Sequence, residues 1–191
     1  MRVLVVYYSR TGYTERVAHS LARRLNADLE SIGSDPRPGA LGYLRCALEA
    51  LLKVPTAIRA TRHDPAAYGL VLIGGPVWFW SLSSPVRSYL MQRRRRLPQL
   101  AFFCTMGGSG AQRVFDAMTT LAGKRPLATL ALTDRDIEEH GQRWLDAFIH
   151  ALKLPHAPAP RPAKRVAQRH GARTRPLPAH RVGAVGHLSA P

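Results

Sequence analysis

Apolar residues in this chain form short continuous runs that alternate with amphipathic stretches. The runs over residues 3–8, 70–73, 100–104 and 127–132 are typical of strands that are buried on both faces of a sheet. Residues 28–32 alternate between apolar and polar side chains and predict one further, shorter strand. The pattern therefore predicts five strands.

Amphipathic spacing between these strands predicts helices. In residues 40–54, for example, leucines recur at steps of three and four, and Pro55 ends the segment. Strands that alternate with helices favour an α/β fold, with a parallel sheet, right-handed crossovers and helices on both faces. The expected helices cover residues 14–25, 40–54, 85–96, 111–122 and 138–153.

Charge is distributed unevenly along the 191 residues, whose net charge is +16. Residues 155–191 hold seven Lys or Arg, seven Pro and no acidic residue, so we expect a disordered basic tail. Residues 1–154 keep a net charge of +9, and 46% of the whole chain is hydrophobic. One folded domain over residues 1–154 is therefore predicted.

The two cysteines, Cys46 and Cys104, predict neither a disulfide framework nor a metal site. They lie far apart, and no CxxC motif or Cys/His cluster accompanies them. The first apolar run is too short for a signal peptide, and no run approaches the ~20 apolar residues of a membrane span. We expect reduced thiols, no membrane span and a cytoplasmic location.

Residues 9–14 form a hydroxyl-rich turn between the first strand and the first helix. A helix N-terminus offers unpaired N–H groups and a positive field to an anion. Ser9, Thr11 and Thr14 add hydroxyl donors, and Gly12 lets the backbone approach the anion closely. Without a lysine or a GxxxxGK[ST] motif, the turn fits a monophosphate better than a nucleotide triphosphate.

Three loops are expected to meet at the carboxyl edge of the sheet, where α/β proteins bind ligands. They are the turn 9–14, the loop 74–84, which holds the aromatic run 76–80, and the glycine-rich loop 105–110. An anion cradle beside aromatic walls and exposed amides suits a flat conjugated ring with a phosphorylated tail.

Each loop also has a simpler interpretation. A Ser/Thr-rich turn before a helix is usually an N-cap, and a glycine-rich loop is often only a flexible turn. Trp78, Phe79 and Trp80 are alternatively core residues or the contact of a homodimer, with different roles for alternate members. The glycine loop does not complete a GxGxxG motif, because Arg113 occupies the last glycine position.

The arginine run 93–96 is expected at the opposite edge of the sheet. The helix that begins near Pro85 starts at the ligand edge, and ~11 residues at ~1.5 Å each carry the chain to the other side. These arginines are therefore predicted to be a solvated helix end that complements the helix dipole. A basic tail attracts polyanions in a salt-dependent manner, which leaves nucleic acid as an alternative partner of residues 155–191.

Three segments carry a resemblance to a known family. They are Tyr8-Ser9-Arg10-Thr11-Gly12-Tyr13-Thr14, Ile73-Gly74-Gly75-Pro76-Val77-Trp78 and residues 102–110, Phe-Phe-Cys-Thr-Met-Gly-Gly-Ser-Gly. With this order of elements, residues 1–153 resemble the flavodoxin-like superfamily, in particular its small bacterial FMN-binding members. The resemblance implies a flavodoxin-like three-layer sandwich, with a five-stranded parallel sheet in the order 2-1-3-4-5 and helices on both faces.

The resemblance also implies where FMN would bind. Tyr13 stands where the family frequently has Asn, and Gly75 stands where it frequently has Thr. The phosphate would be held by Ser9, Thr11, Gly12 and Thr14 with the amides of Arg10 and Tyr13; the isoalloxazine would be bordered by Pro76, Val77, Trp78 and Phe79, and on its other edge by Thr105, Gly107 and Gly108.

An FMN-binding flavoprotein that transfers electrons is the function these residues favour. It would be an NAD(P)H-dependent reductase of quinone-like or other small acceptors, or a flavodoxin-type electron carrier that serves a redox protein. Family carriers are usually acidic, so the charge of +9 on residues 1–154 favours anionic partners or the phosphates of NADPH. No catalytic acid or base is indicated by spacing. The alternative is a non-catalytic flavodoxin-fold interaction protein that binds a polyanion through its basic tail.

Overall fold

The computed structural model describes residues 1–33 and 55–153. The predicted helix 40–54, with Cys46, lies outside the described residues, and so does the predicted basic tail 155–191. Within the described residues the order of strands and helices follows the alternation that the sequence predicts.

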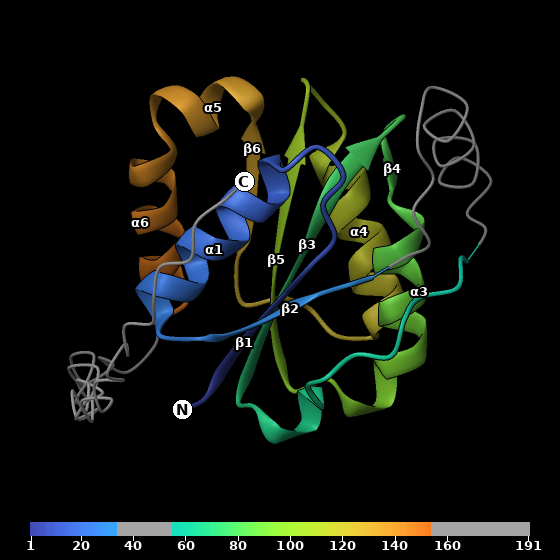
Figure 1. Cartoon of the computed structure of the whole chain (residues 1–191). Helices are drawn as coiled ribbons and strands as arrows, with labels where there is room; N and C mark the ends of the chain where they lie inside the picture. The colour runs from blue at the N-terminus through green and yellow to red at the C-terminus, as the bar shows by residue number, and fades with distance from the viewer. Residues whose placement is uncertain (34–54, 154–191) are drawn as a thin grey trace, which may run out of the picture. The chain divides into compact units, whose positions relative to one another are not determined.

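A parallel sheet forms the centre of the fold, in the order β2-β1-β3-β5-β6 (Figure 1). Counted along the chain, its parallel strands lie in the predicted order 2-1-3-4-5. A short strand, β4 (Ser81–Leu82), pairs antiparallel with the end of β3 and was not predicted. The parallel strands are β1 (Val3–Tyr7), β2 (Asp28–Ser31), β3 (Leu70–Trp78), β5 (Gln99–Met106) and β6 (Thr129–Thr133).

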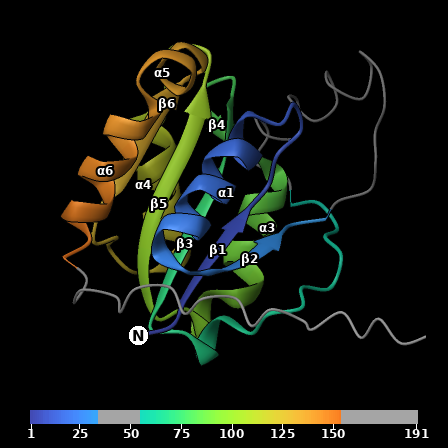
Figure 2. The ribbon, with the colours of Figure 1, turned by 60° about the vertical axis from the view of Figure 1, so that its left-hand side comes forward.

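Helices cover both faces of this sheet, as Figures 1 and 2 show. On one face lie α1 (Tyr13–Leu25), α5 (Asp134–Glu139) and α6 (Gly141–Ala151), and on the other α3 (Ser84–Arg93) and α4 (Ala111–Ala122). Two short 3-10 helices are also present in the described residues: η1 (Pro65–Ala67) lies just before β3, and η2 (Arg94–Arg96) lies between α3 and β5. None of the helices in residues 1–33 and 55–153 combines the length and apolar character needed to cross a membrane.

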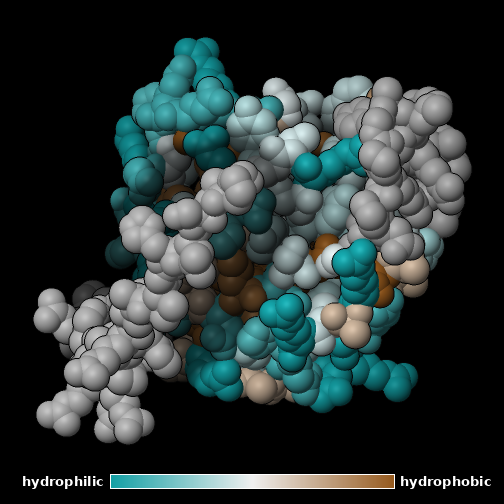
Figure 3. Space-filling view, in the orientation of Figure 1, coloured by the Kyte–Doolittle hydropathy of each residue, from teal (hydrophilic) through white to brown (hydrophobic). Residues whose placement is uncertain are grey.

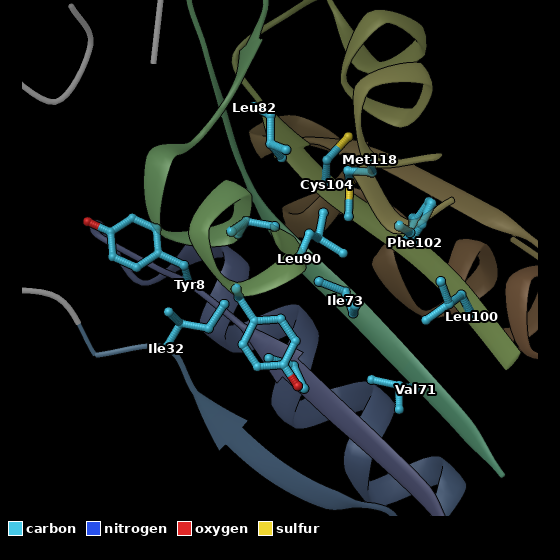
Figure 4. Packing of buried hydrophobic residues seen from close by; sticks show 14 of the residues in the cluster. Tyr8, Ile32, Val71, Ile73, Leu82, Leu90, Leu100, Phe102, Cys104 and Met118 are labelled. Carbon is cyan, nitrogen blue, oxygen red and sulfur yellow. The ribbon is translucent and has the colours of Figure 1, made fainter. Parts of the chain in front are cut away.

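The core between the sheet and α3/α4 is built from the predicted apolar runs (Figure 4). Ile73, Phe102 and Cys104 of the sheet pack against Leu90 of α3 and Met118 of α4. Cys104 is only 1% exposed, and burial raises the pKa of its thiol to about 12. Cys104 is therefore a packing residue of this core.

The opposite core joins the sheet to α1 and α6. Leu21 of α1 and Phe148 of α6 belong to one buried cluster with Leu72 and Phe103 of the central strands. Gly74 is required here, because a Cβ atom at this position would lie 2.2 Å from the ring of Phe103. The close approach of that ring explains a glycine in the middle of a central strand.

The end of β3 differs from the prediction made from local sequence. Residues 74–84 were predicted to be a loop, whereas β3 continues to Trp78 and turns back as β4. Gly75 and Pro76 have strong turn propensity, but here they pair in register with Cys104 and Thr105 of β5. Pairing with a neighbouring strand therefore overrides the turn signal.

The predicted C-terminal helix 138–153 is wrong in its beginning and its continuity. Thr133 forms a capping box, in which its Oγ1 accepts from the amide of Asp136 and the carboxylate of Asp136 accepts from the amide of Thr133. This cap starts α5 at Asp134, and the chain breaks at His140 before α6 begins. The capping signal T-x-x-D is visible in the sequence and outweighs the apolar spacing.

Smaller differences affect three other boundaries. Strand 100–104 is extended at both ends, to Gln99–Met106, and strand 127–132 is shifted to Thr129–Thr133. The predicted helix 85–96 ends at Arg93 and continues as η2. Arg93 donates to Thr61 Oγ1, and Arg96 pairs with Asp64, at the edge where β5 begins. The arginine run thus lies at the edge opposite the three loops, as predicted.

Candidate functional site

The turn after β1 ends at a glycine in a left-handed conformation. Gly12 has φ 91° and occupies the N-cap position of α1, with no side chain capping that helix. Its amide donates to Ser9 Oγ over 3.2 Å. The Ser and Thr hydroxyls of the turn therefore do not act as the ordinary N-cap of α1.

Gly12 leaves the mouth of this turn open. A Cβ atom built on Gly12 would meet nothing within 4 Å, so the glycine is required by its φ and not by a crowded neighbour. Thr11 is exposed, whereas Ser9, Arg10 and Tyr13 are partly buried. Thr11 and the first turn of α1 therefore offer polar groups at the protein surface.

Thr14 differs from the other residues of the turn because it is only 2% exposed. Its hydroxyl lies 2.7 Å from the hydroxyl of Thr105, which is itself 3% exposed and belongs to the end of β5. This buried hydrogen bond joins the turn 9–14 to the strand that leads into the glycine-rich loop. Thr14 therefore holds the turn in position against β5 from its buried side.

Breaking this pair should destabilise the fold in a non-additive way. Thr14→Val or Thr105→Val alone leaves one buried hydroxyl without its partner, at a cost of about 1–3 kcal/mol in the free energy of unfolding. The double variant removes both hydroxyls, so we expect it to cost less than the sum of the single changes. Urea denaturation of the four proteins measures this coupling. Thr120→Val, an exposed threonine of α4, is the matched control, and strictly additive single effects would contradict the coupling.

The second loop is a tight hairpin with two aromatic residues at its tip. Val77 pairs with Leu82 and Trp78 with Ser81, so the loop between β3 and β4 is Phe79-Trp80. Their φ angles are 46° and 55°, and two positive φ angles are the pattern of a type I′ turn, which normally takes Asn-Gly. Large aromatic residues in this conformation are strained.

Burial separates the aromatic residues into two roles. Trp78 is 7% exposed and packs its ring edge-on against Tyr8, with a centroid distance of 5.7 Å. Phe79 and Trp80 are 50% and 56% exposed. The roles of the three aromatic residues differ but do not alternate along the chain, because Trp78 lies in the core and the adjacent residues Phe79 and Trp80 both lie at the surface.

The glycine-rich loop contacts this hairpin directly. Trp80 Nε1 donates to Ser109 Oγ over 2.9 Å. Gly110 has φ 107°, and a Cβ atom there would lie 3.0 Å from Trp80 Cα. At Gly107 and Gly108, by contrast, a Cβ atom would meet nothing within 4 Å. The loop is thus held at Ser109 and Gly110 and is open at the two preceding glycines.

All three loops meet at one edge of the sheet, the upper end in Figure 1. Pro76 and Thr105 are register partners on β3 and β5, and Thr105 in turn bonds to Thr14. The structure thereby brings the predicted residues of the three loops to a common edge. Trp78 is at this edge but faces the core.

Sequence reasoning placed Trp80, Ser109 and Gly110 in the loops of this edge but did not include them among the residues expected to border the ligand. Trp80 belongs to the aromatic run, but a Phe-Trp pair gives no turn signal, so the hairpin that exposes it is not predictable from local propensity. Gly110 was seen only as part of a glycine-rich loop. Its positive φ and its approach to Trp80 become evident only in three dimensions.

The two departures from the family pattern have structural explanations. A Cβ atom on Gly75 would lie 2.7 Å from Val86 Cγ2 and 3.0 Å from Ser83 Oγ, so the approach of α3 favours glycine. The hydroxyl of Tyr13 donates to Glu138 of α5 over 3.5 Å. The surface over α5 is hydrophilic, at the upper left in Figure 3. Tyr13 therefore links the turn to a fourth segment.

An open hollow of about 810 Å³ also adjoins the turn. It begins at residues 11–13 and follows α1 past Arg16 and Arg23. Its described lining includes no residue of the hairpin or of the glycine-rich loop. This hollow therefore reaches the turn from the side of α1 and is not where a flat ring would contact Phe79 or Trp80.

Comparison with known proteins identifies a family relationship. A family model described as Flavodoxin matches residues 2–146. No curated protein sequence matches the chain.

Solved structures with a similar fold are flavoproteins. One is a flavoprotein from Lactobacillus acidophilus NCFM in complex with FMN, at 21% identity and a TM-score of 0.60, covering 72% of this chain and 97% of that one. A protein from Bacteroides eggerthii DSM 20697 that is described as a putative flavoprotein has 22% identity and a TM-score of 0.63, with coverage of 78% and 98%. Oxidised flavodoxin 2 from Bacillus cereus has 14% identity and a TM-score of 0.52, with coverage of 80% and 98%. At these identities the similarity establishes the fold.

Proposed function

The chain belongs to the flavodoxin family, and from this premise we propose that it binds FMN and transfers electrons through it. The observation that carries the proposal is the meeting of the turn 9–14, the Phe79-Trp80 hairpin and the glycine-rich loop at one edge of the sheet. The FMN carried by the similar Lactobacillus acidophilus flavoprotein supports this cofactor.

The turn 9–14 suits the phosphate of FMN. The first turn of α1 presents N–H groups that no side chain caps, and Gly12 keeps its mouth open. We assign phosphate contacts to the hydroxyls of Ser9 and Thr11 and to the amides of Arg10 and Tyr13. Gly12, whose amide donates to Ser9 Oγ, would shape the turn around the phosphate. Thr14 would act through its bond to Thr105, which positions the turn.

The other two loops suit a flat ring. Phe79 and Trp80 expose aromatic surface, and Pro76 and Val77 are partly exposed beside them. Opposite them, Gly107 and Gly108 carry no side chain that would obstruct a ring, and Thr105 lies at the base of this loop. Trp78 would support this wall from the core.

FMN, when bound, would supply the redox chemistry, and the protein would supply binding, orientation and a dry environment. The aromatic tip would shield the ring from water, while the turn would hold the phosphate against dissociation. We assign no proton transfer to a side chain of this chain.

Within this function we propose an NAD(P)H-dependent reductase of quinone-like or other small acceptors. Residues 1–154 carry a net charge of +9, which attracts the phosphates of NAD(P)H and disfavours docking on a basic redox partner. The proposed reaction requires NAD(P)H, and Cys104 is a free thiol. Both fit the cytoplasmic location that we propose for the protein. We propose that residues 1–154 form a single FMN-binding domain and that residues 155–191 lie outside it. The proposal that competes with the redox function is that the protein binds a polyanion through residues 155–191.

Absorption spectroscopy of the purified full-length protein tests the function. The denatured protein should release FMN, and the apoprotein should bind added FMN stoichiometrically, with riboflavin bound about 100-fold more weakly because it lacks the phosphate contacts. FAD is the third ligand in the titration. If FMN does not bind, the redox proposal fails and polyanion binding by the tail becomes the function to test. NAD(P)H oxidation with a quinone acceptor then tests the finer proposal.

A further inference from the structure

Buried polar side chains gather at the beginning of α3. Ser83, Ser84 and Arg87 are 0%, 1% and 7% exposed. Within the described part of the chain, the Oγ atoms of both serines and Nε of Arg87 have no hydrogen-bond partner. The hydroxyl of Tyr89 is also without a partner there, but its ring belongs to the apolar core. Three buried donor atoms within the first turn or so of one helix are therefore without a hydrogen-bond partner among the described residues.

Such an arrangement is costly without an anion. A guanidinium group that is removed from water needs a charged or polar partner, and an unpaired buried hydroxyl also loses its hydration. Burial lowers the pKa of Arg87, and the first turn of α3 contains no acidic residue. The positive end of the α3 dipole adds to this unbalanced charge.

The three side chains belong to the same end of the helix. Ser83 is the N-cap residue of α3, a position where serine usually accepts from the backbone, yet its hydroxyl makes no capping bond. The amide of Arg87 donates to the carbonyl of Ser83 over 3.1 Å, so Arg87 lies one turn further on. Arg87 follows Ser84 by three residues and Ser83 by four, a spacing that brings side chains to the same face of a helix, and helical side chains lean toward the N-terminus.

We propose that the beginning of α3 is a second anion-binding site, separate from the turn 9–14. It would take one phosphate or carboxylate group of a small molecule, bound by Arg87 and by the hydroxyls of Ser83 and Ser84. Arg offers paired donors that match both kinds of oxyanion, and the helix N-terminus favours their charge. Three donor atoms from a single helix end match the few oxygen atoms of one small oxyanion and not an extended polymer.

The place of this site gives it a role beside the loops. Ser83 Oγ would lie 3.0 Å from a Cβ atom built on Gly75, so this hydroxyl is close to β3 where Gly75 precedes Pro76. An anionic substrate anchored at α3 would therefore have its charged end next to the strand that leads to the Phe79-Trp80 hairpin (Figure 1). The anion site itself does not depend on FMN.

Anion titration of the full-length protein tests the site. Inorganic phosphate and acetate are the two probes, each compared with sodium chloride at equal ionic strength, and FMN is added first to occupy the turn 9–14. If FMN does not bind, the titration is made with the Gly12→Val variant instead, in which the turn 9–14 is disrupted. The NMR resonance of Arg87 Nε–H reports binding at α3, and the thermal midpoint reports the affinity.

Arg87→Gln should weaken binding of the preferred probe about tenfold or more, because a charge-assisted hydrogen bond is lost. Arg95→Gln removes the same charge from exposed η2 and should leave binding unchanged. Ser84→Ala is the milder second variant, to be used if Arg87→Gln does not fold. It should weaken binding of the same probe several-fold. A probe that moves the Arg87 resonance identifies the oxyanion. Equal binding by wild type and both α3 variants, or an Arg87 resonance that neither probe moves, overturns the proposal.

Discussion

Gly12→Val should reduce the affinity for FMN about 100-fold while leaving riboflavin binding nearly unchanged. A β-branched residue does not adopt φ 91° without severe strain, so the turn must rebuild around residue 12. The amide that now donates to Ser9 would then change direction, and with it the first N–H groups of α1. In the proposed site these N–H groups would contact the phosphate and not the ring. Riboflavin, which lacks the phosphate, is therefore the informative comparison.

Gly123→Val provides the matched control for this variant. Gly123 has φ 68° at the end of α4, and the nearest atoms to an added Cβ belong to the flexible side chain of Arg94. Both variants should lose about 1–2 kcal/mol of stability from the left-handed backbone. Fluorescence titration with FMN and riboflavin separates them, because only Gly12→Val should lower the ratio of the two affinities. An equal loss for both flavins would contradict a phosphate role for the turn.

The sequence was sufficient for the parallel strands because each has its own apolar or alternating run, whereas their order in the sheet came from the resemblance to the flavodoxin-like superfamily. The runs 70–73 and 100–104 predicted the central strands β3 and β5, and the hydroxyl-rich turn 9–14 was correctly placed between β1 and α1. These signals are local: periodicity, glycine and hydroxyl content. Once the strands alternate with helices, right-handed crossovers restrict the remaining choices.

The sequence was insufficient where distant residues determine the local structure. Pro76 continues β3 because β5 pairs with it, and Thr14 of α1 is buried where its hydroxyl meets that of Thr105 on β5. Phe79-Trp80 adopts a turn that its propensity opposes. In each case tertiary contacts outweigh local preference, and all three cases occur at the candidate site, where strain and unusual burial are expected for functional reasons.

The strain in the hairpin leads to the second large prediction. Phe79→Asn combined with Trp80→Gly places the preferred type I′ residues at two positions of positive φ. Relief of this strain contributes about 1–2 kcal/mol per residue, and loss of the Trp80–Ser109 hydrogen bond removes about 0.5–1.5 kcal/mol. The double variant should therefore be more stable than the wild type, by about 1 kcal/mol or more.

The same double variant should bind FMN about 10- to 100-fold more weakly, because stacking of a flat heterocycle on an aromatic side chain contributes about 1–3 kcal/mol. Urea denaturation of the apoprotein and FMN titration measure the two effects, and Trp144→Gln, which removes an exposed tryptophan of α6, should change neither. Sedimentation analysis distinguishes the competing explanation, since a homodimer contact through Phe79 and Trp80 would be lost with FMN affinity unchanged. Greater stability with weaker FMN binding means that the strained turn is maintained for the ligand, whereas lower stability would assign the two aromatic residues to the fold.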